Sequence, residues 1–230
     1  MALSASATAY LSRFSPGPPS PLWETDPEFM ELFANFALDE VVNQGDLDDA
    51  ARMMAILAAL LGCQGVEEYR VLLPAALRAG VTPVQVKEIL YQSVPYLGIG
   101  RVRPFFSVTN QVLTEQGVAL PLEPGSTTTA ETRLAAGNQA QVDIFGEGMR
   151  GFQNSGPEES RHINRWLADN CFGDYYTRGG LDYKQREMIT FCFLAALGGC
   201  EPQLTSHAGA SLRIGNEKAF LIQGVCQCLA

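Results

Sequence analysis

The sequence predicts an all-α protein built from a duplicated helical unit. Three observations lead to this prediction: apolar residues recur at helical spacing, strand patterns are almost absent, and two stretches of the 230-residue chain share a fixed register. With 47% hydrophobic and 18% charged residues, the composition is typical of a folded globular protein.

The duplication is visible when FALDEVVNQGDLDDAARMM (36–54) is set over NCFGDYYTRGGLDYKQREM (170–188). Five identities share an offset of 134: Gly45 with Gly179, Leu47 with Leu181, Asp48 with Asp182, Arg52 with Arg186, and Met54 with Met188. After a one-residue gap, AALRAG (75–80) lies over ASLRIG (210–215). A register kept over about 60 residues indicates a repeated structural unit.

The first two helices of the first copy have recognisable ends. Acidic residues at 46–49 place negative charge at the start of a helix that we expect to stop near Gly62. A second helix is predicted over about 66–79. It ends at Gly80, which can adopt the left-handed conformation that terminates helices.

A capping box begins the third helix. Thr82 and Gln85 are spaced for reciprocal bonding, with proline at the first helical position. A fourth helix is predicted over 104–117. In the second copy, Gly215 is the expected helix stop and Asn216 the expected N-cap of the following helix.

These signals divide the chain into four segments. We expect an irregular Ser- and Pro-rich tail over 1–25, a first helical repeat over 26–119, a linker over 120–130 and a second repeat over 131–230. The second repeat opens with a helix over about 131–152 and lacks a counterpart of the fourth helix. We therefore expect its last apolar face to be covered by a neighbouring subunit or by further sequence.

Composition excludes several classes of partner. The net charge of −9 argues against nucleic acid and anionic membranes, because phosphate binding needs clustered Lys and Arg. The six cysteines are expected to be reduced thiols. No basic leader precedes the first apolar residues, and the longest apolar runs are too short to span a bilayer, so a cytoplasmic protein is expected. Two isolated histidines and the absence of a nucleotide-binding motif predict no metal and no cofactor.

The run REMITFCFLAALGGCEPQLTSHAGASLRIGN (186–216) resembles the carboxymuconolactone decarboxylase family, which shares the alkylhydroperoxidase D-like fold. In that family an R-E pair begins an apolar helix, a small-residue turn follows, and a second helix carries a histidine. The run RMMAILAALLGCQGVEEYRVLLPAALRAGVTPVQVKEILYQSVPYLG (52–98) looks like the same unit, so the resemblance covers about 150 residues in two tandem repeats. It implies the fold more specifically than the reaction.

The decarboxylase branch of the family implies a cofactor-independent lyase of aromatic-compound catabolism that acts on a carboxymuconolactone-like lactone acid. Loss of carbon dioxide leaves electron density that must be protonated, so a positioned acid/base group is needed. On this resemblance His207 is the acid/base. Arg186 or Arg213 is a candidate for holding a substrate carboxylate, although the recurrence of Arg186 as Arg52 in the first copy favours a structural salt bridge for that residue.

The peroxidase branch implies thiol-dependent, peroxiredoxin-type activity instead. Its Glu, C-x-x-C and His pattern falls here on Glu187, Cys200, Gln203 and His207, with Gln203 in place of the second cysteine. That departure removes the resolving thiol, so turnover would need an outside thiol. Cys200 stands before a helix, where the helix dipole is expected to lower a thiol pKa.

Further residues are candidates for lining a substrate pocket. Helical spacing places Gln203 and Ser211 on the face of His207, and three polar residues in an apolar repeat predict a cavity. The first copy has Leu72 at the position of His207, which predicts a scaffold role for that copy. His162 begins a stretch of mixed aromatic and polar residues. Trp166, Asn170, Tyr175 and Tyr176 in that stretch either line a pocket or pack as an amphipathic helix.

Three functions therefore stay open on the sequence: a lyase centred on His207, a thiol-dependent peroxidase or disulfide reductase centred on Cys200, and a catalytically inert oligomeric binding protein of the same fold. Self-association is expected in each case, because single-repeat members of the family form rings. For a two-repeat chain this implies a trimer.

Overall fold

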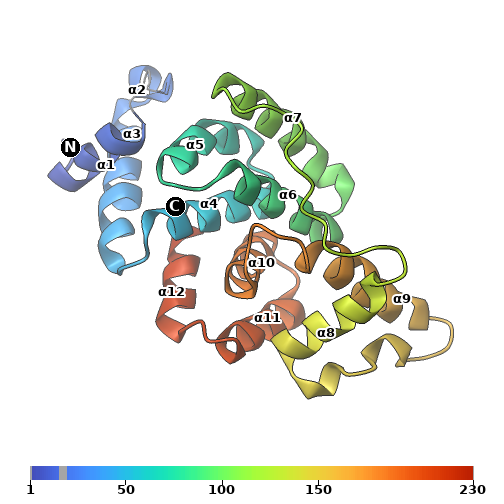
Figure 1. Ribbon diagram of the computed structural model, residues 1–230. Helices are drawn as coiled ribbons and strands as arrows, with labels where there is room; N and C mark the ends of the chain where they lie inside the picture. Colours follow the sequence, from blue (N-terminus) through green and yellow to red (C-terminus); the bar gives the residue numbers. More distant parts are fainter. Residues whose placement is uncertain (1, 16–19, 230) are drawn as a thin grey trace.

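The computed structural model describes residues 2–15 and 20–229, and all regular structure within those ranges is helical (Figure 1). The N-terminal part holds α1 (Ala5–Phe14), α2 (Leu22–Thr25), α3 (Pro27–Asn35), the π-helix η1 (Phe36–Glu40) and the 3-10 helix η2 (Val42–Gln44). The first repeat continues with α4 (Asp49–Cys63), α5 (Val66–Arg78), α6 (Pro83–Leu97) and α7 (Ile99–Glu115). The all-α prediction is confirmed.

The second repeat is preceded by additional helical segments. These are α8 (Arg133–Phe145), the 3-10 turns η3 (Glu147–Met149) and η4 (Phe152–Asn154), α9 (Arg161–Trp166) and the π-helix η5 (Leu167–Tyr176). The repeat itself comprises α10 (Tyr183–Leu197), α11 (Glu201–Arg213) and α12 (Lys218–Gln227). No described helix is long and apolar enough to cross a membrane.

Side-chain caps fix where the central helices begin. Asp48 accepts a hydrogen bond from the backbone N–H of Ala51 at the start of α4. Thr82 with Gln85 forms the expected capping box of α6, and a second box opens α10. The expectation that Asn216 caps the last helix is wrong. Glu217 occupies that position, and the Asn216 amide instead donates to the hydroxyl of Ser211.

The third helix of each repeat packs on both central helices. α4 and α10 pack along each other in the centre of the molecule, and one hydrophobic core extends across both. α6 packs on α4 of its own repeat and on α10 of the other, and α12 packs on α10 of its own repeat and on α4 of the other (Figure 1). Each repeat thus completes the core of the other, which explains why the third helices carry apolar faces.

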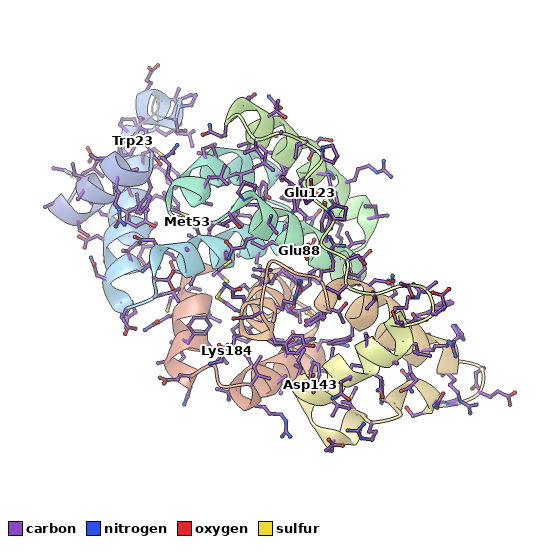
Figure 2. The ribbon with its side chains drawn as sticks, viewed as in Figure 1. Trp23, Met53, Glu88, Glu123, Asp143 and Lys184 are labelled. Atoms are coloured by element: carbon purple, nitrogen blue, oxygen red, sulfur yellow. The ribbon has the colours of Figure 1, made fainter. Side chains whose placement is uncertain are left out.

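Each central helix carries a buried arginine that is hydrogen-bonded to the third helix of the other repeat. Arg186 of α10 donates to the amide oxygen of Gln92 in α6 at 2.8 Å, and Arg52 of α4 donates to Gln227 in α12 at 3.1 Å. The arginines are separated by the repeat offset of 134 and the glutamines by 135. Arg186 also pairs with Glu88, which lies at the boundary between the repeats (Figure 2). The arginine conserved between the two copies therefore fastens one repeat to the other.

The expectation of an irregular tail over 1–25 is wrong for α1 and α2. Ala7 and Phe14 of α1 are buried, and the helix packs against η1 and α5. The apolar spacing of Ala7, Tyr10, Leu11 and Phe14 is that of a helix. The irregular structure that the prolines after residue 15 indicate does not extend back over these residues. Residues 16–19 of that stretch lie outside the described residues.

Other boundaries differ by a few residues. The helix expected over 131–152 ends at Phe145, where Gly146 with φ 100° terminates it. The helix expected to stop at Gly62 extends to Cys63. We expected the apolar face of the last helix to need a cover. α12 packs on α4 and α10 within the chain, and its apolar residue Ile222 is 52% exposed. The division into four segments and the self-association stay predictions.

A close approach between backbones at the centre of the fold gives a test. A Cβ atom added at Gly62 would lie 2.4 Å from the backbone oxygen of Phe193, so Gly62→Ala must push α4 away from α10. We expect a loss of about 1–3 kcal/mol in the free energy of unfolding, measured by urea denaturation. Gly100→Ala is the control, because nothing lies within 4 Å of that added atom. Equal stabilities of the two variants would contradict the central packing.

Candidate functional site

A histidine and a glutamate from adjacent helices form the centre of the candidate site. The Nδ1 atom of His207, on α11, lies 2.8 Å from the Oε2 atom of Glu187, on α10. Glu187 is fully buried and His207 is 7% exposed. Because a carboxylate only accepts hydrogen bonds, the hydrogen between them belongs to Nδ1, which leaves Nε2 as the ring nitrogen turned away from Glu187.

The second oxygen of Glu187 is held by a tyrosine. The hydroxyl of Tyr176, at the end of η5, donates to Oε1 of Glu187 at 3.0 Å. Its oxygen also lies 2.9 Å from the hydroxyl of Thr190. Since a phenol has one proton and Tyr176 gives it to Glu187, Thr190 must be the donor in that second bond. Both oxygens of the buried carboxylate therefore have a partner.

The first repeat contributes a further hydroxyl. Tyr96 of α6 lies 2.8 Å from the hydroxyl oxygen of Tyr176 and 3.4 Å from Nε2 of His207. The rings of Tyr96 and His207 meet edge to face, with centroids 5.6 Å apart. Burial raises the pKa of Tyr96 and of Tyr176 well above the ordinary value, so both keep their protons at neutral pH. A protonated Nε2 would thus find an oxygen acceptor in Tyr96.

A hydrogen-bonded chain continues from this cluster into the boundary between the repeats. The amide nitrogen of Gln92 donates to the Thr190 hydroxyl at 2.8 Å and to the backbone oxygen of Arg186 at 2.9 Å. Arg186 pairs with Glu88, which also accepts from Arg178 at 2.9 Å. The packing of the two repeats and the position of the site hydroxyls are therefore coupled.

Close contact between η5 and α8 sets the position of Tyr176. A Cβ atom at Gly137 of α8 would lie 1.8 Å from the backbone oxygen of Ala168, and one at Gly173 of η5 would lie 2.2 Å from that of Arg133. Glycine at both positions lets the helices approach until their backbones touch. π-Helical turns are rare in proteins, and those that occur are often found at functional sites. Tyr176 is the last residue of this one, and it contacts Glu187.

A depression of about 450 Å³ lies beside the histidine. One stripe of α11 forms its wall, through Ser206, Gly209, Ala210 and Arg213, and Phe145 and Met149 lie opposite. The ring of Phe145 also packs against His207, with centroids 5.3 Å apart. Phe145 therefore contacts both the depression and the ring of His207.

Several predicted site residues do not join this cluster. Gln203 is exposed, and Ser211 is buried against Asn216, so the expected polar face does not line one cavity. Cys200 donates to the backbone oxygen of Leu194 at 3.3 Å. Burial, together with the charge of Glu201, raises its pKa, so the expected lowering is wrong. A protonated thiol without a second cysteine gives the peroxidase hypothesis no nucleophile at this position.

The three other predicted binding residues are separated in space. Arg186 is fully buried and already paired, so the hypothesis that it binds a substrate carboxylate is wrong. Arg213 is exposed at the rim of the depression. His162 is exposed on α9 and stacks on Trp166, with centroids 4.7 Å apart. The site role predicted for His162 has no support in these contacts.

Sequence reasoning missed Tyr96, Thr190 and Gln92, and gave Tyr176 only as one of several aromatic residues. Tyr96 and His207 are 111 positions apart and come from different repeats. Helical spacing within one repeat gives no signal for such a contact. Among the described residues, no group of three or more His, Cys, Asp or Glu side chains is placed to hold a metal.

Comparison with known proteins agrees with this architecture. The model of the carboxymuconolactone decarboxylase family matches residues 27–111 and 162–222, together more than half of the chain. A crystal structure from Burkholderia xenovorans, provisionally described as a gamma-carboxymuconolactone decarboxylase subunit, matches with a TM-score of 0.60 and 22% identity. The match covers 97% of this chain and 88% of that one. No curated protein matches the sequence.

The hydroxyl of Tyr176 provides a test of the buried cluster. Tyr176→Phe removes the donor to Glu187 and should lower the free energy of unfolding by about 1–3 kcal/mol, because a buried acceptor loses its partner. Tyr175→Phe, at the half-buried neighbouring position, should change it by less than about 0.5 kcal/mol. Denaturation curves that show equal losses for both variants would contradict the assigned bond.

Proposed function

This chain belongs to the carboxymuconolactone decarboxylase family, and from that premise we propose that it is a cofactor-independent carboxy-lyase acting on a small lactone acid. The observation that carries the proposal is the buried pair of Glu187 and His207 beside a depression with an arginine at its rim. The depression has the volume of a small-molecule site.

In the proposed reaction, the bond between the ring carbon and the departing carboxylate breaks. Its electron pair delocalises into the adjoining unsaturated lactone, and carbon dioxide leaves. A proton from Nε2 of the imidazolium then adds to carbon and gives an enol-lactone. Glu187 accepts from Nδ1 and keeps the ring in one orientation. Tyr96 accepts from Nε2 until the substrate replaces it.

Substrate binding in this proposal depends on Arg213. Its guanidinium lies over Gly146, where an added Cβ atom would come within 2.8 Å of it, so the loop that ends α8 keeps it at the rim. A second carboxylate of the substrate, one not lost in the reaction, can bind there in bidentate geometry. The apolar ring of Phe145 then closes over the reacting part of the molecule and excludes water.

Replacing His207 tests the acid/base role. His207→Gln keeps an amide donor for Glu187 and a similar volume but cannot transfer a proton, so turnover of γ-carboxymuconolactone should fall by about 10²-fold or more. Carbon dioxide release gives the rate, and circular dichroism checks the fold. His162→Gln, at the exposed histidine, should keep full activity. A His207→Gln enzyme with more than half of the original rate would exclude this mechanism.

Replacing Arg213 tests the carboxylate anchor. Arg213→Met keeps the length of the side chain and removes its charge, so KM for a dicarboxylated lactone should rise by about 10-fold or more, since one charge-assisted pair contributes about 1.5–3 kcal/mol. kcat should change less, because the anchor acts in the ground state as well. Arg165→Met, at an exposed position on α9, is the control. An unchanged KM in Arg213→Met would show that the substrate carboxylate does not bind at Arg213.

A further inference from the structure

Two thiols lie where the C-terminal helix packs on α10. Cys192 lies in α10 and is fully buried, and Cys228 is the partly buried C-cap residue of α12. Both sulfur atoms approach the same backbone oxygen, that of Gly224, at 4.0 Å for Cys192 and 3.5 Å for Cys228. Both thiols are free.

Gly224 of α12 lies against Cys192 of α10. A Cβ atom added there would lie 3.7 Å from the sulfur of Cys192, and it is the nearest atom to that position. Both sulfur atoms thus lie within 4.0 Å of one carbonyl oxygen, on two helices that pack together. A disulfide between them requires the two sulfur atoms to approach to bonding distance.

We propose that Cys192 and Cys228 are a redox-active pair that a hydroperoxide converts to a reversible disulfide, at a site separate from Cys200 and independent of the proposed lyase reaction. Cys228 is the attacking residue, because it alone of the two has exposed surface. Cys192 is the resolving residue, since solvent need not reach it.

The electrostatics of the pair assign the same roles. The neighbouring thiol of Cys192 lowers the pKa of Cys228. The neighbouring thiol of Cys228, together with complete burial, raises the pKa of Cys192 well above its ordinary value. Cys228 is thus the sulfur that becomes a thiolate first, and the thiolate is the nucleophile toward a peroxide.

The chemistry balances in two steps. The Cys228 thiolate attacks one oxygen of the hydroperoxide, forming an S–O bond as the O–O bond breaks. The released hydroxide or alkoxide takes up a proton, and Cys228 becomes a sulfenic acid. The sulfur of Cys192 then attacks that of Cys228, its proton leaving with the hydroxyl group as water. Two thiols lose two electrons in total, and a dithiol reductant restores them.

Peptide mapping of the purified chain tests this proposal. Trypsin cleaves after Arg186, Arg213 and Lys218, which puts Cys192 with Cys200 in one peptide and Cys226 with Cys228 in another. The double variant Cys200→Ser, Cys226→Ser leaves one cysteine in each peptide. After treatment with a small excess of hydrogen peroxide, we expect the two peptides to be linked, and dithiothreitol to separate them.

Variants of the pair separate the two roles. In Cys192→Ala, the sulfenic acid of Cys228 should persist and be trapped by dimedone. In Cys228→Ser, peroxide consumption should fall at least tenfold, whereas Cys63→Ser, which removes an exposed thiol, should leave it unchanged. Two results would overturn the proposal: an unlinked pair of peptides in the double variant after oxidation, or a linkage that appears only in unfolded protein. Neither result bears on His207, so the lyase reaction is tested separately.

Discussion

Arg186 lies without exposed surface at the boundary between the two repeats, where an unpaired charge would cost several kcal/mol. Burial lowers the pKa of its guanidinium, and Glu88 of the other repeat offsets this effect. Any arrangement that separates α6 from α10 would leave the guanidinium of Arg186 buried without its carboxylate partner. The pairing of Arg186 with Glu88 and Gln92 therefore confines the relative position of the two helices on which the candidate site depends.

The site follows from that constraint. Once Gln92 is bonded to Arg186 and Thr190, α6 has a fixed rotation over α10, and Tyr96, one turn further along, lies over His207. Tyr176 then closes the cluster from η5. A substitution in the boundary between the repeats can consequently alter the site without touching the histidine.

The duplication is functionally asymmetric. The offset that pairs Arg186 with Arg52 places Met53 opposite Glu187, and the later offset places Leu72 opposite His207. Both counterparts are apolar, and Met53 is part of the central core. The first repeat thus keeps the structural arginine, has no counterpart of Glu187 and His207, and supplies α6 to the candidate site of the second. The described chain holds one such cluster, made by both repeats.

The sequence by itself determined the helical class and the capping of α6, which depend on local spacing, and the duplication, which depends on a shared register. The choice of His207 and Glu187 came from the family resemblance, and the recurrence of arginine at 52 and 186 already favoured a structural salt bridge. Only the tertiary structure decided which groups Arg186 pairs with, that Cys200 and Gln203 lie apart from the cluster, and that Tyr96 belongs to it. The physical reason is distance along the chain. A hydrogen bond between residues 111 positions apart is set by how two repeats pack, and no periodicity in either repeat encodes that packing.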